Sequence, residues 1–499
     1  MARIVVIGAG MGAMTAAARL AVAGHQVVVH ERARTYGGAL GRVERDGFAF
    51  DAGPALLHLP AVYRDLFVKT GKAPLEDRVE LSQVEPAVRH VFADGTAVDL
   101  PNASRAGVSE ALDAALGAGA GERWSAFMNR ARDAWDRTRR PLLEEPLWPN
   151  WQVLAEREPY PSVPRRRLLR RERRAATLAE IAEWELGGEP RLAALLGHFA
   201  LAHGLDPRSA PASAAVLPYL EQTFGTWSVR GGLRALATAV YERCLERRVE
   251  FAFGSAVARV VVKDGGAAGV ELADGTVVDA DIVVAGVAPG VLGRLLPGAE
   301  VRAPGGVPAQ AAAPSRLTVL LALRGARPEG TPHRTVLHAP DAAAEVDRLF
   351  GPRPGVPAAP TLAVLRPDDP EGTPDADHEA VTLRATVPAG AEVTDADVQR
   401  LIDRAEAAVP GLRDRLLWHE VRTPADVAEA TGADGGAVPA PALAAASGRL
   451  LHPANSTAIR GLFAVGGWSH PGGGLPHAGM SGTLVAGLIV EGPEFRGSQ

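Results

Sequence analysis

Residues 3–31 read RIVVI-GAGMGA-MTAAARLAV-AGH-QVVVHE, in which two β-branched runs enclose a glycine-rich turn and a stretch of helix-forming composition. This order predicts a strand, a helix and a second buried strand. The turn has the G-x-G-x-x-A form of a dinucleotide-binding sequence, and the second strand ends on an acidic residue. The segment therefore predicts a Rossmann-type α/β domain that binds a dinucleotide.

The small residues of the turn have separate roles in such a site. Gly8 permits the tight turn, Gly10 lets the backbone approach the pyrophosphate, and Ala13 allows the helix to pack closely on the strand. The start of the helix offers free N–H groups and a partial positive charge to the phosphates. Glu31 lies where a carboxylate accepts hydrogen bonds from ribose hydroxyls and repels a 2′-phosphate.

The composition is that of a globular protein with two or three domains. The chain has 499 residues, of which 47% are hydrophobic and 22% charged, and its net charge is −5. This balance gives no reason to expect nucleic acid as a partner. Cys244 is the single cysteine, which excludes an intrachain disulfide, and the histidines lack metal-ligand spacing. We therefore predict no metal and a cytoplasmic protein without a membrane span.

Further glycine-rich motifs follow along the chain. Gly37-Gly38 and Asp51-Ala52-Gly53-Pro54 come after Glu31, Gly231-Gly232 opens a helix, and residues 461–482 read GLFAVGGWSHPGGGLPHAGMSG. In this order the motifs resemble those of the FAD-dependent phytoene desaturase family, within the wider amine-oxidase-like flavoproteins. The resemblance covers about half of the chain and is specific for the fold and for FAD, and less so for the substrate.

The resemblance implies a set of contacts with FAD. The first turn would face the pyrophosphate, Glu31 the ribose and the backbone of Val257 the adenine. The turn at 474–477 would aim N–H groups at the N1/C2=O edge of the flavin, where negative charge develops on reduction. The residues assigned to FAD in this way are Gly8, Gly10, Gly12, Ala13, Glu31, Arg32, Gly37, Gly38, Ala39, Pro54, Ala55, Val257, Gly466, Gly467, Gly474, Leu475 and His477.

One position departs from the family pattern. The residue after the glycine pair is usually basic in these flavoproteins, but here it is Ala39. A phosphate contact is then missing unless Arg32, Arg34 or Arg42 replaces it. We therefore expect FAD to bind more weakly than is typical.

The predicted architecture is a discontinuous FAD-binding domain joined to an α+β substrate-binding domain. The FAD-binding domain is assigned to 1–100, 225–300 and 445–499, and the substrate domain to 101–224 and 301–444. Helices are predicted at 105–118, 121–138, 175–187, 189–203 and 395–409, and strands at 316–323, 361–365, 380–387 and 416–421.

Two histidines near the C-terminus are candidate catalytic residues, His470 and His477. His477 stands in a turn that often carries glycine in the resembling family, and an imidazole with a pKa near 6.5 exchanges protons at neutral pH. The helix N-terminus would keep this ring neutral. A functional His477 favours oxidation at or beside a heteroatom, because a hydrocarbon has little need of such a base. His198, His203 and Glu221 are interpreted as ordinary polar groups.

The first hypothesis for function is an FAD-dependent dehydrogenase or desaturase. It would oxidise a largely apolar small molecule, a polyene or another secondary metabolite, by hydride transfer to flavin N5. The alternative is an oxidase of a C–N bond, as in the amine-oxidase relatives, although the only lysines are Lys69, Lys72 and Lys263. A second alternative is a non-catalytic flavin-bound partner or carrier of an apolar ligand.

An arginine-rich segment lies within the first insertion. Residues 165–174 read RRRLLRRERR on a chain that is acidic overall. A solvated surface is one interpretation of this segment. The other is peripheral docking to an anionic membrane or to an acidic carrier protein.

Overall fold

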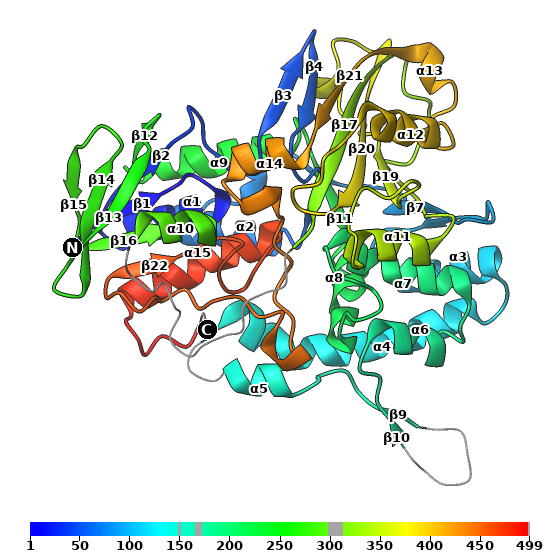
Figure 1. Ribbon diagram of the computed structural model, residues 1–499, viewed down its shortest axis with the longest axis horizontal. Helices are drawn as coiled ribbons and strands as arrows, with labels where there is room; N and C mark the ends of the chain where they lie inside the picture. The colour runs from blue at the N-terminus through cyan, green and yellow to red at the C-terminus, as the bar shows by residue number, and fades with distance from the viewer. Residues whose placement is uncertain (148–150, 165–171, 298–312, 498–499) are drawn as a thin grey trace.

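The computed structural model describes residues 1–147, 151–164, 172–297 and 313–497. Two regions lie side by side, and each is built around its own sheet (Figure 1). One contains a five-stranded sheet between layers of helix and small sheet. The other contains a seven-stranded sheet that lies against a layer of helices.

The five-stranded sheet is parallel throughout, in the order β12-β2-β1-β16-β22. Its side chains are buried on both faces, as in other parallel sheets. The sheet confirms the predicted α/β Rossmann-type domain and shows that it is assembled from distant segments. The strands are β1 (Arg3–Ile7), β2 (Gln26–Glu31), β12 (Glu250–Phe253), β16 (Ile282–Ala285) and β22 (Leu462–Ala464).

Alternate residues of β1 face the two covering layers. Ile4 and Val6 pack in the cluster that contains α1 (Met11–Val22), α9 (Leu233–Glu246) and part of α15 (Leu475–Val490). Val5 and Ile7 pack toward the opposite layer. That layer is the antiparallel sheet of β13 (Val257–Lys263), β14 (Gly266–Leu272) and β15 (Val277–Asp279), together with α10 (Pro289–Leu295).

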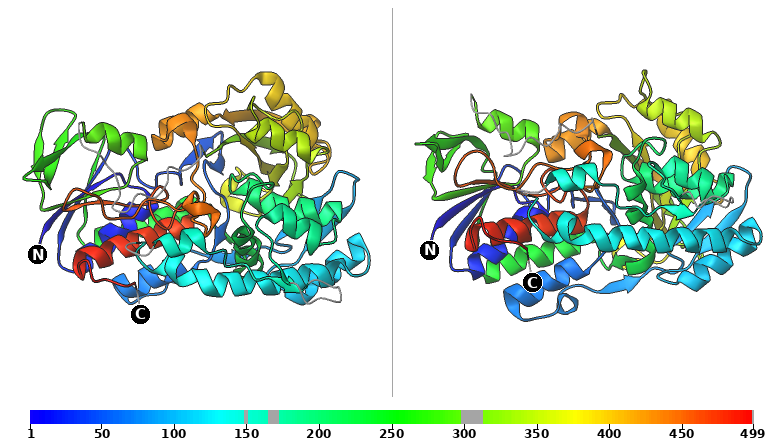
Figure 2. Two further views of the ribbon diagram at one scale, coloured as in Figure 1. Left: turned by 60° about the horizontal axis from the view of Figure 1, so that its bottom comes forward. Right: turned by 90° about the horizontal axis from the view of Figure 1, so that it is seen from below.

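The first and last long helices lie against each other. α1 contacts α15 along its length, and the two ribbons run side by side in Figure 2. Glycines make this approach close. A Cβ built on Gly482 would lie 2.4 Å from the carbonyl oxygen of Gly12, so no larger residue fits there without a backbone shift. The two ends of the chain thus close one domain.

The seven-stranded sheet has the order β21-β17-β20-β19-β18-β7-β8. The strands predicted at 316–323, 361–365, 380–387 and 416–421 are confirmed in it. Strands β7 and β8, which end the sheet on one side, come from the segment 1–100 that the sequence assigned to the FAD-binding domain. They join this sheet because β7 pairs in parallel with β18. The strands are β7 (Val88–Val91), β8 (Ala97–Leu100), β17 (Ser315–Arg324), β18 (Arg334–Leu337), β19 (Leu362–Leu365), β20 (His378–Val387) and β21 (Leu416–Arg422).

The four helices predicted in the first insertion are confirmed, and Figure 2 shows the longest of them crossing beneath the second region. The helix predicted at 395–409 ends at Ala405, a few residues before Pro410, which cannot continue it. The helices of this region are α3 (Arg105–Leu116), α4 (Ala120–Arg139), α6 (Leu178–Trp184), α7 (Pro190–Ala202), α8 (Val216–Phe224) and α12 (Asp395–Ala405).

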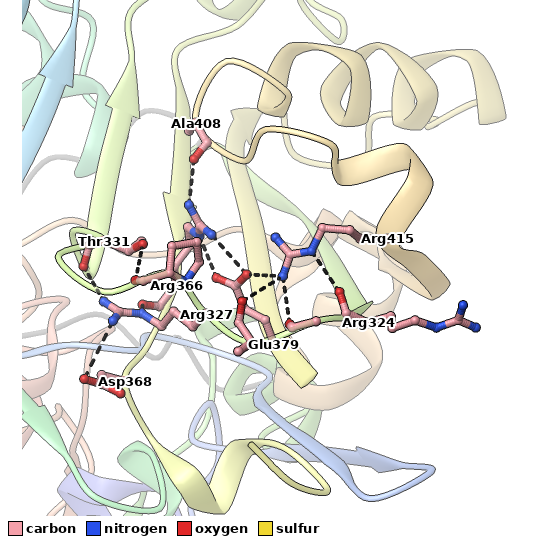
Figure 3. Close-up of polar contacts among 11 residues, drawn as sticks. Arg324, Arg327, Thr331, Arg366, Asp368, Glu379, Ala408 and Arg415 are labelled. Carbon is pink, nitrogen blue, oxygen red and sulfur yellow. Dashed lines mark hydrogen bonds and ion pairs between the residues drawn. The ribbon is translucent and has the colours of Figure 1, made fainter. Parts of the chain in front are cut away.

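A buried ion-pair network ties the far end of the second sheet together (Figure 3). Arg366, the residue directly after β19, donates to both carboxylate oxygens of Glu379 on β20, at 2.7 and 3.0 Å. Arg415 donates to the same carboxylate at 2.8 Å, and Arg327 donates to the carbonyl oxygen of Arg366 at 3.0 Å. Glu379 is only 1% exposed, so water does not hydrogen-bond to its carboxylate. Arg415 supplies a further charged hydrogen bond in place of that water.

Small sheets and short helices make up the remaining elements. A small sheet in the order β5-β11-β6 lies between the two regions, and β3 pairs with β4. Within the described residues no helix is long and apolar enough to cross a membrane. The other elements are β3 (Arg42–Arg45), β4 (Phe48–Asp51), β5 (Leu57–His58), β6 (Leu81–Gln83), β9 (Val163–Pro164), β10 (Glu172–Arg173), β11 (Thr226–Val229), α2 (Ala61–Gly71), α5 (Trp151–Glu156), α11 (Ala342–Phe350), α13 (Leu412–Arg415) and α14 (Pro424–Thr431).

Candidate functional site

The glycine-rich turn between β1 and α1 leaves an open space at one residue. Gly8 has φ +91°, and a Cβ on it would lie 3.0 Å from the carbonyl oxygen of Gly286. A Cβ on Gly12 would lie 2.7 Å from the carbonyl oxygen of Ala478. A Cβ on Gly10 would meet nothing within 4 Å. Since no side chain caps α1, the open side of Gly10 and the free N–H groups fit a pyrophosphate.

Glu31 is held beside this turn. Its Oε2 accepts a hydrogen bond from the N–H of Ala9 at 2.7 Å, and its Oε1 accepts one from the N–H of Ala33 at 2.8 Å. Each carboxylate oxygen has a second lone pair. The carboxylate is therefore oriented at the end of β2 and retains acceptor capacity for ribose hydroxyls, as the sequence predicts.

The loop that carries the second glycine pair is supported by a residue that the sequence analysis missed. Arg234 of α9 donates to the carbonyl oxygens of Tyr36 and Leu40, and its guanidinium stacks over the ring of Tyr36. The N–H of Gly37 donates to the carbonyl oxygen of Ala9 at 2.8 Å, which fixes the loop against the first turn. The one signal in the sequence for this role is the position of Arg234, two residues after Gly232 at the start of a helix.

Two of the three arginines proposed to replace a basic residue at position 39, Arg32 and Arg42, have other partners. Arg32 donates to the carbonyl oxygen of Glu429, at the end of α14. Arg42 donates to Glu44 and to the carbonyl oxygen of Gly231. Neither guanidinium is directed at the start of α1. The expectation of a phosphate contact from Arg32 therefore finds no support in this geometry.

Asp51, the last residue of β4, connects that strand to α9. It accepts hydrogen bonds from the N–H groups of Leu233 and Arg234, at 3.0 and 3.3 Å, and so caps that helix. Burial raises the pKa of Asp51 to about 6. Close by, Arg384 of β20 donates to the carbonyl oxygen of Gly53, so the second region braces the segment that precedes Pro54 and Ala55.

The C-terminal turn presents a second uncapped helix. α15 begins at Leu475 without a side-chain cap, and a Cβ on Gly466 would meet nothing within 4 Å. The first N–H groups of α15 are therefore free to donate to an electron-rich ligand. The N1/C2=O side of a flavin has this character. Gly474 at the cap has φ +104°, a conformation that favours glycine.

His477 lies within this turn and faces the substrate region. Its side chain lines a small cavity together with Trp135 of α4 and Leu217 and Leu220 of α8. Burial, followed by the positive charges of His203, His452 and His470, lowers the pKa of His477 to about 3. The ring is therefore neutral at physiological pH, as predicted. The sequence analysis attributed the neutral ring to the helix N-terminus and assumed a pKa near 6.5. The structure instead gives burial as the cause and a pKa far below 6.5.

His470 makes structural contacts. Its Nε2 lies 2.9 Å from the carbonyl oxygen of Glu145, and its own carbonyl accepts a hydrogen bond from Asn455 at 2.9 Å. The side chain is fully buried, and burial lowers the pKa of His470 to about 4. These contacts join the C-terminal segment to the end of α4 and give His470 a positioning role. Among the described residues no group of histidine, cysteine and carboxylate side chains could hold a metal.

The open side of Gly10 leads to a specific prediction. Gly10→Ala is expected to weaken FAD binding by about 1–3 kcal/mol, because the new methyl group would occupy the space for the pyrophosphate, while the free protein stays as stable as the parent. Gly12→Ala is expected instead to destabilise the free protein, since its Cβ would meet backbone atoms.

The test compares FAD titration and thermal unfolding of the FAD-free forms. Gly293→Ala is the matched control, because Gly293 lies in α10 and a Cβ there meets nothing within 4 Å. Gly10→Ala with unchanged FAD affinity would mean that the pyrophosphate lies elsewhere.

The parallel sheet, the open glycine turn and the acidic end of β2 together define a dinucleotide-binding protein of the Rossmann type. Comparison with known proteins places it more narrowly. The chain belongs to the family described as flavin containing amine oxidoreductase, which matches residues 14–320. Its cofactor is FAD, and it is an FAD-dependent oxidoreductase of the phytoene desaturase type.

Similar proteins match over nearly the whole chain. The 4,4'-diapolycopene oxygenase of Methylomonas sp is 29% identical over 514 residues, which cover 98% of both chains. The hydroxyneurosporene desaturase of Rubrivivax gelatinosus is 29% identical and covers 98% of this chain and 93% of its own. An oxidoreductase structure from Methanosarcina mazei has the same fold, with a TM-score of 0.63, 17% identity and coverage of 97% and 99%.

Proposed function

We propose that this chain oxidises a polyene by removing two hydrogen atoms from adjacent carbons. Full-length similarity to proteins named diapolycopene oxygenase and hydroxyneurosporene desaturase supports this substrate class. Bound FAD supplies the acceptor for a hydride. The neighbouring carbon loses a proton, and a new C=C bond forms from the electrons left behind, so the reaction balances as two electrons and two protons removed.

The observation that carries the proposal is the apolar character of the wall facing the C-terminal turn. Around His477 the cavity is lined by tryptophan and leucine side chains of α4 and α8 and of the segment that follows α4. Such a wall fits a hydrocarbon chain and excludes water from the reacting carbons. The three lysines, Lys69, Lys72 and Lys263, are all exposed, so none of them assists a C–N oxidation from inside.

The function is tested by anaerobic mixing of the FAD-loaded protein with candidate substrates. A polyene is expected to bleach the flavin absorbance, whereas a primary amine of similar length is not. Bleaching by the amine alone would favour the C–N oxidase. No bleaching by either, with bound polyene recovered from the protein, would favour the carrier.

We further propose that the segment 165–174 docks on an anionic membrane surface, from which a lipid-soluble polyene is taken up. Residues 165–171 lie outside the described residues, and the support is the arginine content of the sequence. Binding to vesicles that contain anionic lipid is expected at low ionic strength and should be lost when the arginines are replaced by glutamine. Equal binding by both forms would contradict the proposal.

A further inference from the structure

Two arginines lie next to each other on one face of the seven-stranded sheet. In the antiparallel pairing of β17 with β20, Arg316 is opposite Thr386 and Thr318 is opposite Arg384. Opposite residues share a face, so Arg316 and Arg384 are diagonal neighbours, and long side chains reach each other across that separation. These two residues form the arginine pair.

The arginine pair faces away from the core of the second region. Leu317 and Leu383, which alternate with the pair along β17 and β20, pack in the cluster that contains α12. The opposite face carries the pair, and Phe48 and Phe50 of β4 cover it further along. Because β4 belongs to the segment 1–100, this face of the sheet is turned toward the FAD-binding domain.

The partners of the arginine pair are neutral oxygens. Arg316 donates to two carbonyl oxygens of the second region, at 3.2 and 2.7 Å, and to the hydroxyl of Thr386 at 3.2 Å. Arg384 donates to the carbonyl oxygen of Gly53. Among the described residues, Asp51 is the one acid whose charge acts on either guanidinium. Its carboxylate already accepts two N–H groups of α9.

The positive charges of the arginine pair lack a full counter-charge. Burial, followed by the neighbouring charge of Arg384, lowers the pKa of Arg316 to about 10, so the guanidinium is still protonated at neutral pH. Burial also lowers the pKa of Arg384, although Asp51 opposes this effect. Both side chains are half-buried and remain accessible to a ligand. Since adjacent cations away from bulk water are costly, we expect a ligand to bring negative charge to them.

The contacts of Gly53 place the arginine pair beside the cofactor site. A Cβ on Gly53 would lie 2.0 Å from the carbonyl oxygen of Ala39, and a Cβ on Gly38 would lie 3.1 Å from the Cα of Gly10. Four residues after Gly53, β5 begins at Leu57 and contacts α15. The segment from Gly53 to Leu57 therefore runs from the glycine-rich turn toward α15. The uncapped starts of α1 and α15 are the two places that fit the ends of FAD.

We propose that the arginine pair stabilises the negative charge that FAD gains on reduction, and so raises the reduction potential of the bound cofactor. Fixed positive charge near a group on which electrons accumulate favours its reduced state. A higher potential favours the removal of a hydride from carbon, which is a weak hydride donor. The inference depends on FAD as the cofactor and not on the identity of the substrate.

The test measures the reduction potential of bound FAD by equilibration with a reference dye, in the absence of any substrate. Arg384→Gln and Arg316→Gln are each expected to weaken the binding of reduced FAD relative to oxidised FAD about ten- to hundredfold, because one charge is lost from a partly buried site. For a two-electron couple this ratio is a fall in potential of about 30–60 mV. Arg384→Lys keeps the charge, so its ratio should stay within about threefold of the wild type.

Arg404→Gln is the matched control. Arg404 is also half-buried, and it also donates to carbonyl oxygens, those of Leu337 and His338. It belongs to α12, which covers the opposite face of the sheet. The potential of this variant should equal that of the wild type.

An unchanged potential in both glutamine variants of the pair would overturn the proposal, and so would an equal fall in Arg404→Gln. Titration with oxidised FAD separates a purely structural role. Loosening of the Gly53 segment would weaken oxidised and reduced FAD equally and leave the potential unchanged, which would also overturn the proposal. If Arg384→Gln does not bind FAD, Arg316→Gln decides, because its hydrogen bonds lie within the second region. A polyene that fails to bleach the flavin would contradict the proposed function alone, since the potential is measured without substrate.

Discussion

Replacing His477 by alanine is expected to slow flavin reduction by the substrate about 10²- to 10⁴-fold, the usual contribution of a positioned proton acceptor. Loss of hydride leaves a cationic carbon chain, and a C–H bond beside such a centre is acidic enough for a weak base. The neutral ring of His477 faces the same cavity as Trp135 and Leu217 and is placed to accept that proton. A hydrocarbon substrate therefore does not argue against a role for this histidine, contrary to the expectation from the sequence.

The pH dependence separates this role from that of an ordinary imidazole. Because burial lowers the pKa of His477 to about 3, the ring stays unprotonated and the reduction rate is expected to be flat between pH 6 and 8. Rapid anaerobic mixing measures the rate in wild type, in His477→Ala and in His419→Ala, where His419 is an exposed control. A wild-type rate that falls as the pH drops through 6.5 would contradict the low pKa. A loss below about threefold in His477→Ala would leave the ring a packing residue.

The protein is also expected to lose its folded state in mild acid. Burial lowers the pKa of His333, His452 and His470 to about 4 and that of His338 to about 3. In the unfolded chain these rings bind protons below about pH 6.5, whereas in the folded protein they stay neutral until much lower pH. Stability is therefore present above pH 6.5 and is lost as the pH falls. The loss is about 2 kcal/mol for each ring at pH 5.

Two buried carboxyl groups act in the opposite direction. Burial raises the pKa of Asp51 to about 6 and that of Glu158 to about 7, so protonation of these groups stabilises the folded protein as the pH falls. At pH 5 their contribution is about 4 kcal/mol, half of the ~8 kcal/mol lost through the four histidines, so the net loss approaches the lower end of the stability of a typical domain. Unfolding is therefore expected as the pH falls below about 5.

Thermal unfolding measured at closely spaced pH values tests this expectation. His452→Gln is expected to weaken the pH dependence by about one proton, because glutamine keeps a donor for the carbonyl oxygen of Ala440 but does not titrate. His419→Gln should leave the pH dependence unchanged. A melting temperature that stays constant down to pH 5 would show that these rings take up protons while folded.

The Rossmann-type domain was predictable because its signals are local. A β-branched run, a glycine turn and a second run ending on Glu31 occupy fewer than thirty residues, and each element follows the last in space as it does in sequence. The same holds for α3, α4, α6 and α7, whose helical periods are long enough to be distinctive. The place of Glu31 at the end of β2 is confirmed, and its role toward a ribose stays a prediction.

The rest depended on contacts between residues far apart in the chain. β7 and β8 are four residues each, and their short alternating pattern does not indicate that β18 is the partner of β7. Glu221 forms an ion pair with Arg334, which is 113 residues away. The pKa of His477 was misjudged for the same reason. The glycines around His477 suggest an open turn, whereas α4 and α8 from the first insertion cover the His477 side chain.

The packing of α1 on α15 fixes when the cofactor site can form during synthesis. The backbone of Gly12 packs directly against that of Gly466, and one emerges from the ribosome some 450 residues after the other. Before β22 is made, β16 is an unpaired edge of the sheet. Before α15 is made, the glycine-rich turn and α1 expose apolar surface that α15 later covers. The complete cofactor site therefore forms only once α15 has been synthesised.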